Sequence, residues 1–507
     1  MMTWLRSLPF FVLLMGIGSL AMLIPAFHAA AVGATPQMQT FFYASLLSTT
    51  LTLLAALATA GTHPRNATLS QLGTLVLAFG ALPVLFAVPF QEAASNIRFV
   101  DAWFEMVSSF TTTGATLYDR AGRLPPSVHL WRATVGWLGG LLTWVVAVAI
   151  FAPMNLGGFE VRAAGGSTRS TIAGFSQKGL VARMQDRLAR HTLTLTPIYV
   201  GLTFILWLGL VVLGEVPTIA LCHAMSTLST SGISPINGVY YAVSGFWGEV
   251  LIFLFFAFAI SRLTFSRGMF GDSDARLVRD PEVHMALLLI SGTTMMLFAR
   301  HWLGSIEEGT ASGLPDLFAS LWGSIFTVTS FLTTTGFESR YWDGAAEWSG
   351  LETPGLFLVG LALIGGGAAT TAGGVKLLRV YALFRHSERE VQRLLHPSSV
   401  GGGGREARMI RKQGAYVSWV FFMLFALSIA ATMILVSMTG VQFEVSMVLT
   451  VASLSTTGPL AVVAAESPIS YAGIPDAAKA ILAGAMVLGR LETLALIALF
   501  NPEIWRR

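Results

Sequence analysis

A hydroxyl-rich run that ends in a single glycine occurs four times in this chain, and the repetition constrains the fold more than any other feature. The four runs are SSFTTTGA at 108–115, STLSTSGI at 226–233, SFLTTTGF at 330–337 and ASLSTTGP at 452–459. Their glycines lie 118, 104 and 122 residues apart. Because internal repeats of this kind set the architecture, we expect one structural unit to be repeated four times around a central axis.

The composition is that of a membrane protein. Of the 507 residues, 54% are hydrophobic and 11% are charged, whereas a soluble domain carries about 25% charged residues. Apolar runs near the roughly 20 residues that a helix needs to cross a bilayer recur along the chain. A β-barrel would instead need roughly ten-residue alternating segments. We therefore predict an all-α polytopic membrane protein rather than a soluble protein with an unusually apolar core.

Charge, cysteine and histidine content argue against several other functions. The net charge of +4 is small and the basic residues lie in loops, so no nucleic-acid partner is expected. The single cysteine, Cys222, excludes an internal disulfide and a multi-cysteine metal site. The histidines are isolated, which argues against a membrane-embedded enzyme: His28, His191, His223 and His284. The chain has no P-loop, so we expect no cofactor in it, and regulation by a nucleotide would come from another subunit.

Ten spanning segments are predicted. Two precede the repeats, at 9–30 and 41–60, and the first is interpreted as a retained span although its start could pass for a signal peptide. Each repeat then reads as a span, a short amphipathic helix, the hydroxyl–glycine loop and a returning span. The paired spans are 72–90 and 128–153, 193–213 and 246–265, 283–303 and 355–384, and 415–438 and 477–500. The short helices are 101–110, 218–228, 314–332 and 443–454.

This pattern divides the chain into five parts. We expect an N-terminal helical hairpin at 1–68, repeat one at 69–158, a basic linker with repeat two at 159–270, repeat three with a broken second span at 271–386, and a basic linker with repeat four at 387–507. The linkers between 159 and 190 and between 379 and 412 are rich in Arg and Lys. With ten spans they lie on one side together with both termini, and the positive-inside rule makes that side cytoplasmic. The glycine run 401–404 marks a flexible point in the second linker.

The hydroxyl–glycine loops are predicted to enter the membrane from outside and to bind a cation. Irregular backbone at membrane depth is tolerated only where it is buried in protein or lines water. Ordinary loops or helix-packing surfaces would explain one such run better than four in register. Carbonyl and hydroxyl oxygens can replace the hydration shell of an ion, glycine permits unusual dihedral angles, and helix C-termini favour cations. The loops contain no acidic residue, which favours a monovalent cation. The candidate filter residues are Thr111, Thr112, Thr113, Gly114, Ser229, Thr230, Ser231, Gly232, Thr333, Thr334, Thr335, Gly336, Ser455, Thr456, Thr457 and Gly458.

A glycine-rich interruption and one arginine are candidates for a gate. The run IGGGAATTAGGV at 364–375 holds five glycines. Each costs about 1 kcal/mol relative to Ala in a helix, so the run should break the second span of repeat three unless it serves tight helix packing. Arg490 lies inside an apolar span, where a charge is costly and usually faces protein or water. The alternative for Arg490 is a structural ion pair, and for Lys376 an ordinary position at the cytoplasmic edge. The gate candidates are Gly365, Gly366, Gly367, Thr370, Thr371, Gly373, Gly374, Lys376 and Arg490.

Two acidic residues, Glu105 and Glu492, lie near these features. Glu105, in the first short helix, could attract cations or pair with neighbouring groups, and we favour the structural role. Glu492 is two residues beyond Arg490, so the two side chains do not share a helix face.

The chain resembles the Trk/Ktr/HKT superfamily of potassium transporters, and most of all its TrkH branch. The resemblance covers nearly all of the chain. It rests on SFTTTGA at 109–115, FLTTTGF at 331–337, WLGG at 137–140, RLLHP at 393–397 and GRLE at 489–492. It implies a pseudo-fourfold pore of four M1–P–M2 units, each made of a span (M1), a short pore helix with its loop (P) and a returning span (M2). It also implies a homodimer in membrane lipid and a cytoplasmic nucleotide-binding partner of the RCK/KTN type.

The resemblance also implies a function. It implies passive potassium uptake across the cell inner (plasma) membrane, with filter glycines that favour potassium over sodium. The broken span would be the gating loop, and Arg490 would lie in the pore beneath the filter. Loops two and four carry Ser-Thr-Ser and Ser-Thr-Thr before their glycines, where Asn-Ala and Asn-Val are common in the branch. A sodium-permeable or ion-coupled (K⁺/Na⁺ or K⁺/H⁺) transporter is therefore the alternative. Potassium would be held at Thr112, Thr113, Thr230, Ser231, Thr334, Thr335, Thr456 and Thr457.

Overall fold

The computed structural model confirms an all-helical membrane protein. It describes residues 8–59, 67–152, 158, 161, 177–261, 280–308, 314–343, 354–396, 412–465 and 467–491. Every regular element in these ranges is a helix, and none is a strand. Seven helices of the described part are long and apolar enough to cross a membrane. The glycine run 401–404 and Glu492 lie outside the described residues.

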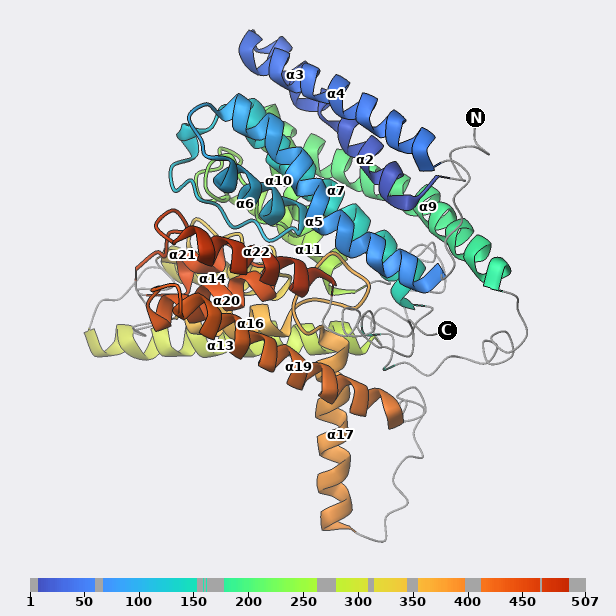
Figure 1. Cartoon of the computed structure of the whole chain (residues 1–507). Helices are drawn as coiled ribbons and strands as arrows, with labels where there is room; N and C mark the ends of the chain where they lie inside the picture. Colours follow the sequence, from blue (N-terminus) through green and yellow to red (C-terminus); the bar gives the residue numbers. More distant parts are fainter. Residues whose placement is uncertain are drawn as a thin grey trace.

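The helices follow the predicted order closely (Figure 1). The first two spans are α2 (Phe10–Ala21) with α3 (Leu23–Ala31), and α4 (Thr35–Thr59). The helices that follow are α5 (Ala67–Ala94), α6 (Phe99–Phe110), η1 (Ala121–Arg123), α7 (Pro126–Val146), η2 (Ala147–Phe151), α9 (Gln177–Val212), α10 (Pro217–Ser229), α11 (Gly245–Ile260), α13 (Pro281–Glu308), α14 (Leu314–Leu332), α16 (Gly355–Ile364), α17 (Leu377–Leu395), α19 (Lys412–Ser437), α20 (Phe443–Leu454), α21 (Leu460–Val463) and α22 (Asp476–Leu491).

One of the predicted spans is shorter than expected. Helix α11 ends at Ile260, where Ser261 adopts an extended backbone. Helix α16 stops at Ile364, where the predicted interruption begins, and the part of the predicted last span after Leu491 lies outside the described residues. By contrast, α9 is longer than predicted: it begins at Gln177, well before the predicted start of the span at 193. The polar segment that precedes this span therefore continues the same helix.

An aromatic cluster connects the N-terminal hairpin to the first repeat. Trp131 of α7 packs against Phe41 of α4 and Phe86 of α5, with ring centroids 6.0 and 5.6 Å apart. Phe86 also meets Phe110 at the end of α6, with centroids 5.7 Å apart. Each aromatic side chain removes roughly 150–250 Å² of surface from solvent. This cluster thus fixes the helix end from which the first hydroxyl–glycine loop begins.

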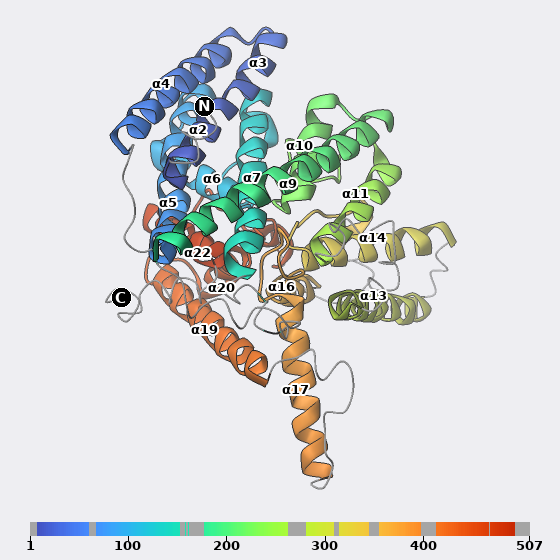
Figure 2. The ribbon, with the colours of Figure 1, turned by 90° about the vertical axis from the view of Figure 1, so that its right-hand side faces the viewer.

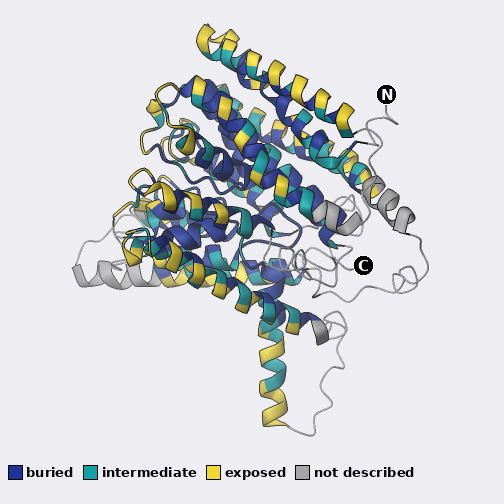
Figure 3. Ribbon diagram, in the orientation of Figure 1, coloured by how far each residue is buried: buried dark blue, intermediate teal, exposed yellow. Residues whose placement is uncertain are grey.

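Helix α17 projects away from the body of the molecule (Figures 1 and 2). Its base is buried and its far end is exposed (Figure 3). At the base, the guanidinium carbon of Arg379 lies 3.7 Å from the centroid of the Phe421 ring on α19. A cation held over an aromatic face is stabilised by the charge distribution of the ring, so this contact anchors the projecting helix to the membrane domain.

Candidate functional site

The four short helices α6, α10, α14 and α20 end in the same backbone turn. The residue two positions before each glycine is a threonine in the left-handed region, with φ between 52° and 57°: Thr112, Thr230, Thr334 and Thr456. In each turn, the next N–H donates to a carbonyl five residues earlier, as in Thr113 to Ser108 at 2.8 Å and Thr335 to Ser330 at 2.9 Å. This pattern is a Schellman motif, which usually has glycine at the left-handed position. A left-handed threonine costs roughly 1–2 kcal/mol, so all four loops store strain at the same place.

The glycines bring the four loops together in a closed ring. A Cβ atom placed on Gly114 would lie 1.8 Å from the backbone oxygen of Ser231 in the second loop. A Cβ on Gly232 would lie 2.3 Å from the oxygen of Thr335 in the third loop. One on Gly336 would meet Pro459 of the fourth loop at 2.9 Å, and one on Gly458 would meet the nitrogen of Ala115 in the first loop at 2.1 Å. Each loop therefore approaches the next so closely that only glycine fits at the contact.

The fourth loop differs from the other three. Gly114, Gly232 and Gly336 have φ angles of 72°, 64° and 80°, whereas Gly458 is not left-handed. Its N–H donates to the Thr113 carbonyl of the first loop at 2.6 Å. The proline that follows, Pro459, is the N-cap of the short helix α21.

The hydroxyl groups of the loops follow two patterns. Those that flank the left-handed threonine pair with each other in three loops, as in Thr111 with Thr113 at 2.8 Å and Thr333 with Thr335 at 3.1 Å. Among the candidate filter residues, all of which lie in the described part of the chain, the hydroxyls of Thr112, Ser455 and Thr456 are buried and have no hydrogen-bond partner. Buried polar atoms are nearly always paired, so these three oxygens remain available for a further contact.

A non-helical segment separates α16 from α17, and it lies against the hydroxyl–glycine loops. Helix α16 ends at Ile364 and α17 begins at Leu377. The N–H of Gly373 donates to the Thr334 hydroxyl at 2.8 Å, and the Thr371 hydroxyl donates to the Leu228 carbonyl at 3.0 Å. We call residues 365–376 the interrupting loop. It contacts the second and third hydroxyl–glycine loops or the helix ends that carry them.

Part of the interrupting loop turns toward α11 instead. The Gly367 N–H and the Thr370 hydroxyl both donate to the Ala259 carbonyl, at 2.9 and 3.2 Å. The Ala368 N–H donates to the Glu282 carboxylate at 2.8 Å. Gly366 and Gly367 therefore contact the end of a neighbouring span, and only the second half of the loop reaches the ring.

Arg490 joins the interrupting loop to two other elements. Its guanidinium donates to the Thr371 carbonyl at 2.7 Å and to the Thr143 hydroxyl of α7 at 3.0 Å. Lys376 is buried, and its ammonium donates to the Ala372 carbonyl. Both cations lie on a cavity between the loop, α7 with η2, and α22. The cavity is lined by Thr143, Ala147, Phe151, Ala369, Thr370, Ala372, Gly373, Gly374, Lys376, Gly489 and Arg490.

The sequence did not reveal the contribution of α7 to this cavity. The expected span 128–153 reads as one α-helix, yet its end is a π-helical turn at Ala147–Phe151. Such turns are frequent at functional sites, but nothing in the local sequence marks this one. The WLGG motif at 137–140 belongs to the same helix, where Gly139 lies against the Phe110 backbone and Gly140 against Ser229. These glycines let α7 pass close to the ends of α6 and α10.

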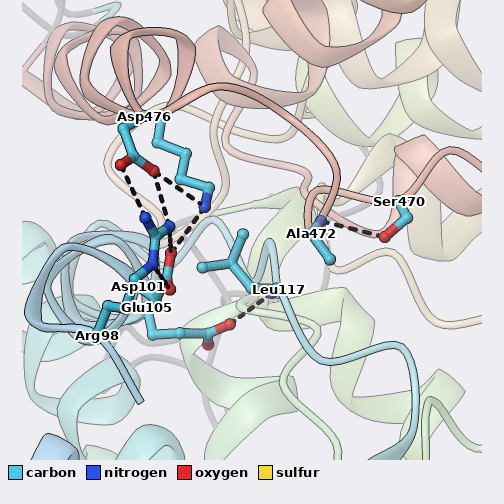
Figure 4. A network of polar contacts seen from close by, with 8 residues as sticks. Arg98, Asp101, Glu105, Leu117, Ser470, Ala472 and Asp476 are labelled. Carbon is cyan, nitrogen blue, oxygen red and sulfur yellow. Dashed lines mark hydrogen bonds and ion pairs between the residues drawn. The ribbon is translucent and has the colours of Figure 1, made fainter.

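Glu105 is a buried structural group. Its carboxylate lies 2.9 Å from Nε of Arg132 on α7. It also accepts hydrogen bonds from the Leu117 N–H at 2.6 Å and the Thr116 hydroxyl at 2.8 Å. The contact with Leu117 is visible in Figure 4. The ion pair offsets the charge of Glu105, and Arg132 was the partner that sequence reasoning did not identify.

An ion-pair network above Glu105 joins the first and last repeats at the rim (Figure 4). Arg98, just before α6, contacts Asp101 at 2.9 Å and Asp476 of α22 at 2.8 Å. Lys479 contacts Asp101 at 2.7 Å. Burial alone would raise the pKa of Asp101, but Arg98 and Lys479 outweigh it and hold the pKa below its ordinary value. Asp101 therefore keeps its negative charge at neutral pH.

Comparison with known proteins assigns the family. Residues 35–507 match the TrkH family, described as cation transport protein. The Trk system potassium uptake protein TrkH of Salmonella typhimurium is 32% identical over 443 residues, covering 85% of this chain and 84% of that protein. TrkH of Escherichia coli K12 is 31% identical over the same shares.

A solved structure shows the same fold. The crystal structure of the potassium transporter TrkH from Vibrio parahaemolyticus matches with a TM-score of 0.79 at 24% identity, covering 99% of both chains. With the family match over most of the length and relatives above 30% identity, the chain belongs to the TrkH family of cation transport proteins.

Proposed function

We propose that this chain takes up potassium through a pore whose selectivity filter is formed by the four hydroxyl–glycine loops. The observation that carries the proposal is the closed ring, in which each loop meets the next at a position that only glycine can occupy. A ring of neutral backbone and hydroxyl oxygens can replace the hydration shell of a monovalent cation. The family relatives are named potassium uptake proteins, which supports potassium as the transported ion.

Within the ring, we place the ion on oxygens of the left-handed threonines and the residues that follow them. The buried, unpartnered hydroxyls of Thr112 and Thr456 support this placement. The other proposed positions are Thr113, Thr230, Ser231, Thr334, Thr335 and Thr457. The left-handed turn repeats in all four loops, so equivalent oxygens would lie at one level of the pore.

The interrupting loop and Arg490 form the proposed gate. The loop touches the ring through Gly373, and Arg490 holds it through the Thr371 carbonyl. A positive charge at this place would repel a cation that leaves the filter. Movement of the loop away from the ring, together with Arg490, would open the path.

The assembly and orientation are proposed from the sequence. We propose the division into a hairpin and four repeats at the boundaries given above. Both termini and the basic linkers would lie in the cytoplasm, in the cell inner membrane. The working unit would be a homodimer regulated by a cytoplasmic nucleotide-binding subunit, and the projecting helix α17 lies on the same proposed side as the basic linkers.

Ion flux in proteoliposomes tests the filter through Gly336→Ser. The purified wild-type chain should carry K⁺ and Rb⁺ well above Na⁺ and Li⁺. The substitution places a side chain against Pro459 at a left-handed φ of 80°. Such a residue costs roughly 1–2 kcal/mol, so we expect the ratio of Na⁺ to K⁺ flux to rise about tenfold.

Three results would count against the proposal. Equal Na⁺ and K⁺ flux through the wild type would favour the sodium-permeable alternative. That alternative arises because the second and fourth loops differ from the sequences common in the TrkH branch. A K⁺ flux that requires a Na⁺ or H⁺ gradient would favour the ion-coupled transporter. The absence of flux for every cation, with and without the regulatory subunit, would contradict the pore itself.

A further inference from the structure

The segment that follows each filter glycine is held by the short helix that precedes the same glycine, and this contact recurs in three of the four units. The helix residue nine positions before the glycine is Glu105, His223, Thr327 or Leu449. All four side chains are buried. The position is therefore equivalent in all units, but its chemistry is polar in three and apolar in one.

The three polar side chains reach the same place. Glu105 accepts hydrogen bonds from the Thr116 hydroxyl and the Leu117 N–H, two and three residues after Gly114. His223 Nε2 lies 2.9 Å from the hydroxyl of Ser234, two residues after Gly232. The hydroxyl of Thr327 accepts from the Ser339 N–H at 3.2 Å, three residues after Gly336. Three chemically different side chains thus form a hydrogen bond with the segment two or three residues after the glycine.

Buried partners from outside the loop support two of these contacts. The ion pair with Arg132 of α7 fixes the Glu105 carboxylate. In the third unit, Glu249 of α11 accepts hydrogen bonds from the Ser339 hydroxyl at 2.7 Å and the Arg340 N–H at 2.8 Å. Each of these contacts connects the loop to a span of the first or second repeat, so movement of the loop would have to break them.

The fourth unit is held differently. Leu449 packs in the hydrophobic core and has no polar group to offer. Instead, the hydroxyl of Tyr471, which follows α21, donates to the Gly458 carbonyl at 3.2 Å. The fourth loop is therefore held at its glycine and from outside the short helix, in agreement with its different backbone at Gly458.

We propose that Glu105, His223 and Thr327, with Tyr471 in the fourth unit, are positioning residues that set the ion selectivity of the filter. This inference rests on the proposed function of the loops. The side chains do not touch the ion. They hold the outer half of each strained loop, and a filter that discriminates by the spacing of its oxygens needs that spacing to be fixed.

The sharpest test uses Thr327→Val, which keeps the shape of the side chain and removes the acceptor for the Ser339 N–H. We expect the ratio of Na⁺ to K⁺ flux in proteoliposomes to rise about three- to tenfold, the range that loss of one buried hydrogen bond produces. Thr327→Ser keeps the hydroxyl and should restore the wild-type ratio. Leu449→Val changes the equivalent position of the fourth unit without removing a hydrogen bond, so its ratio should equal that of the wild type.

Tyr471→Phe provides a second, independent variant in case Thr327→Val does not fold, and its flux ratio should also rise. Melting temperatures of all variants separate positioning from stability. A lower melting temperature with an unchanged flux ratio in both variants would show a purely structural role and overturn the inference. If Gly336→Ser loosens selectivity in the same assay while Thr327→Val and Tyr471→Phe do not, the filter assignment stands and the positioning role fails. If none of the three changes the ratio, both fail.

Discussion

Gly114→Ala is expected to reduce potassium flux roughly 30- to 150-fold. The new methyl group would lie 1.8 Å from the Ser231 oxygen, which belongs to the backbone of the second loop and has no rotamer by which to move away. The first loop must therefore leave its place in the ring. Overpacking of this kind costs about 2–3 kcal/mol, and the fraction of chains with an intact ring falls by the corresponding factor.

The chain offers a matched control at Gly33, between α3 and α4. Gly33 has a φ of 76°, close to the 72° of Gly114, but a Cβ there would meet nothing within 4 Å. Gly33→Ala therefore imposes the same backbone strain, about 1–2 kcal/mol, without touching the ring. Potassium flux per folded molecule should stay near the wild-type value. If both variants lose flux to the same extent, strain rather than the ring contact explains the loss, and the filter argument would lose its main support.

The helices and several of their bounds could be predicted because they depend on local signals. Apolar runs near the length of a bilayer gave the spans, and α14 and α20 have the bounds that were predicted, Leu314–Leu332 and Phe443–Leu454. The break at residue 364 also followed from local chemistry, since five glycines cannot be sustained in one helix. These features need only the intrinsic preferences of neighbouring residues.

The details of the ring could not be predicted because they depend on contacts between distant segments. Local preference places glycine in the left-handed region, yet a threonine in each loop adopts it as well. Gly458 does not adopt the left-handed conformation, because its N–H donates a hydrogen bond to the Thr113 carbonyl of another repeat. The pairing of Glu105 with Arg132 joins residues on two different helices. A pattern in one segment carries no information about such partners.

Arg490→Met is expected to raise potassium flux about 10- to 150-fold in proteoliposomes that contain no regulatory subunit. Methionine keeps an unbranched side chain of similar reach but lacks the charge and the donors to Thr371 and Thr143. A hydrogen bond from a charged group contributes about 1.5–3 kcal/mol, and its loss shifts the balance between closed and open loop by the stated factor. Loss of the charge also removes the repulsion that a cation meets below the ring.

Thr143→Val separates the contributions of the two contacts. It removes the hydroxyl that Arg490 Nε reaches on α7 and leaves both the charge and the hydrogen bond to the Thr371 carbonyl in place. Flux should therefore stay close to that of the wild type, because this hydrogen bond joins α22 to α7 and the interrupting loop keeps its own contact with Arg490. If Arg490→Met folds normally and its flux is equal to or below that of the wild type, Arg490 supports the structure and does not close the pore. If Thr143→Val raises flux as much as Arg490→Met, the contact with α7 holds the gate shut and the charge does not. The π-helical turn at Ala147–Phe151, one turn further along the same helix, would then be the element to examine for movement, because it borders the same cavity.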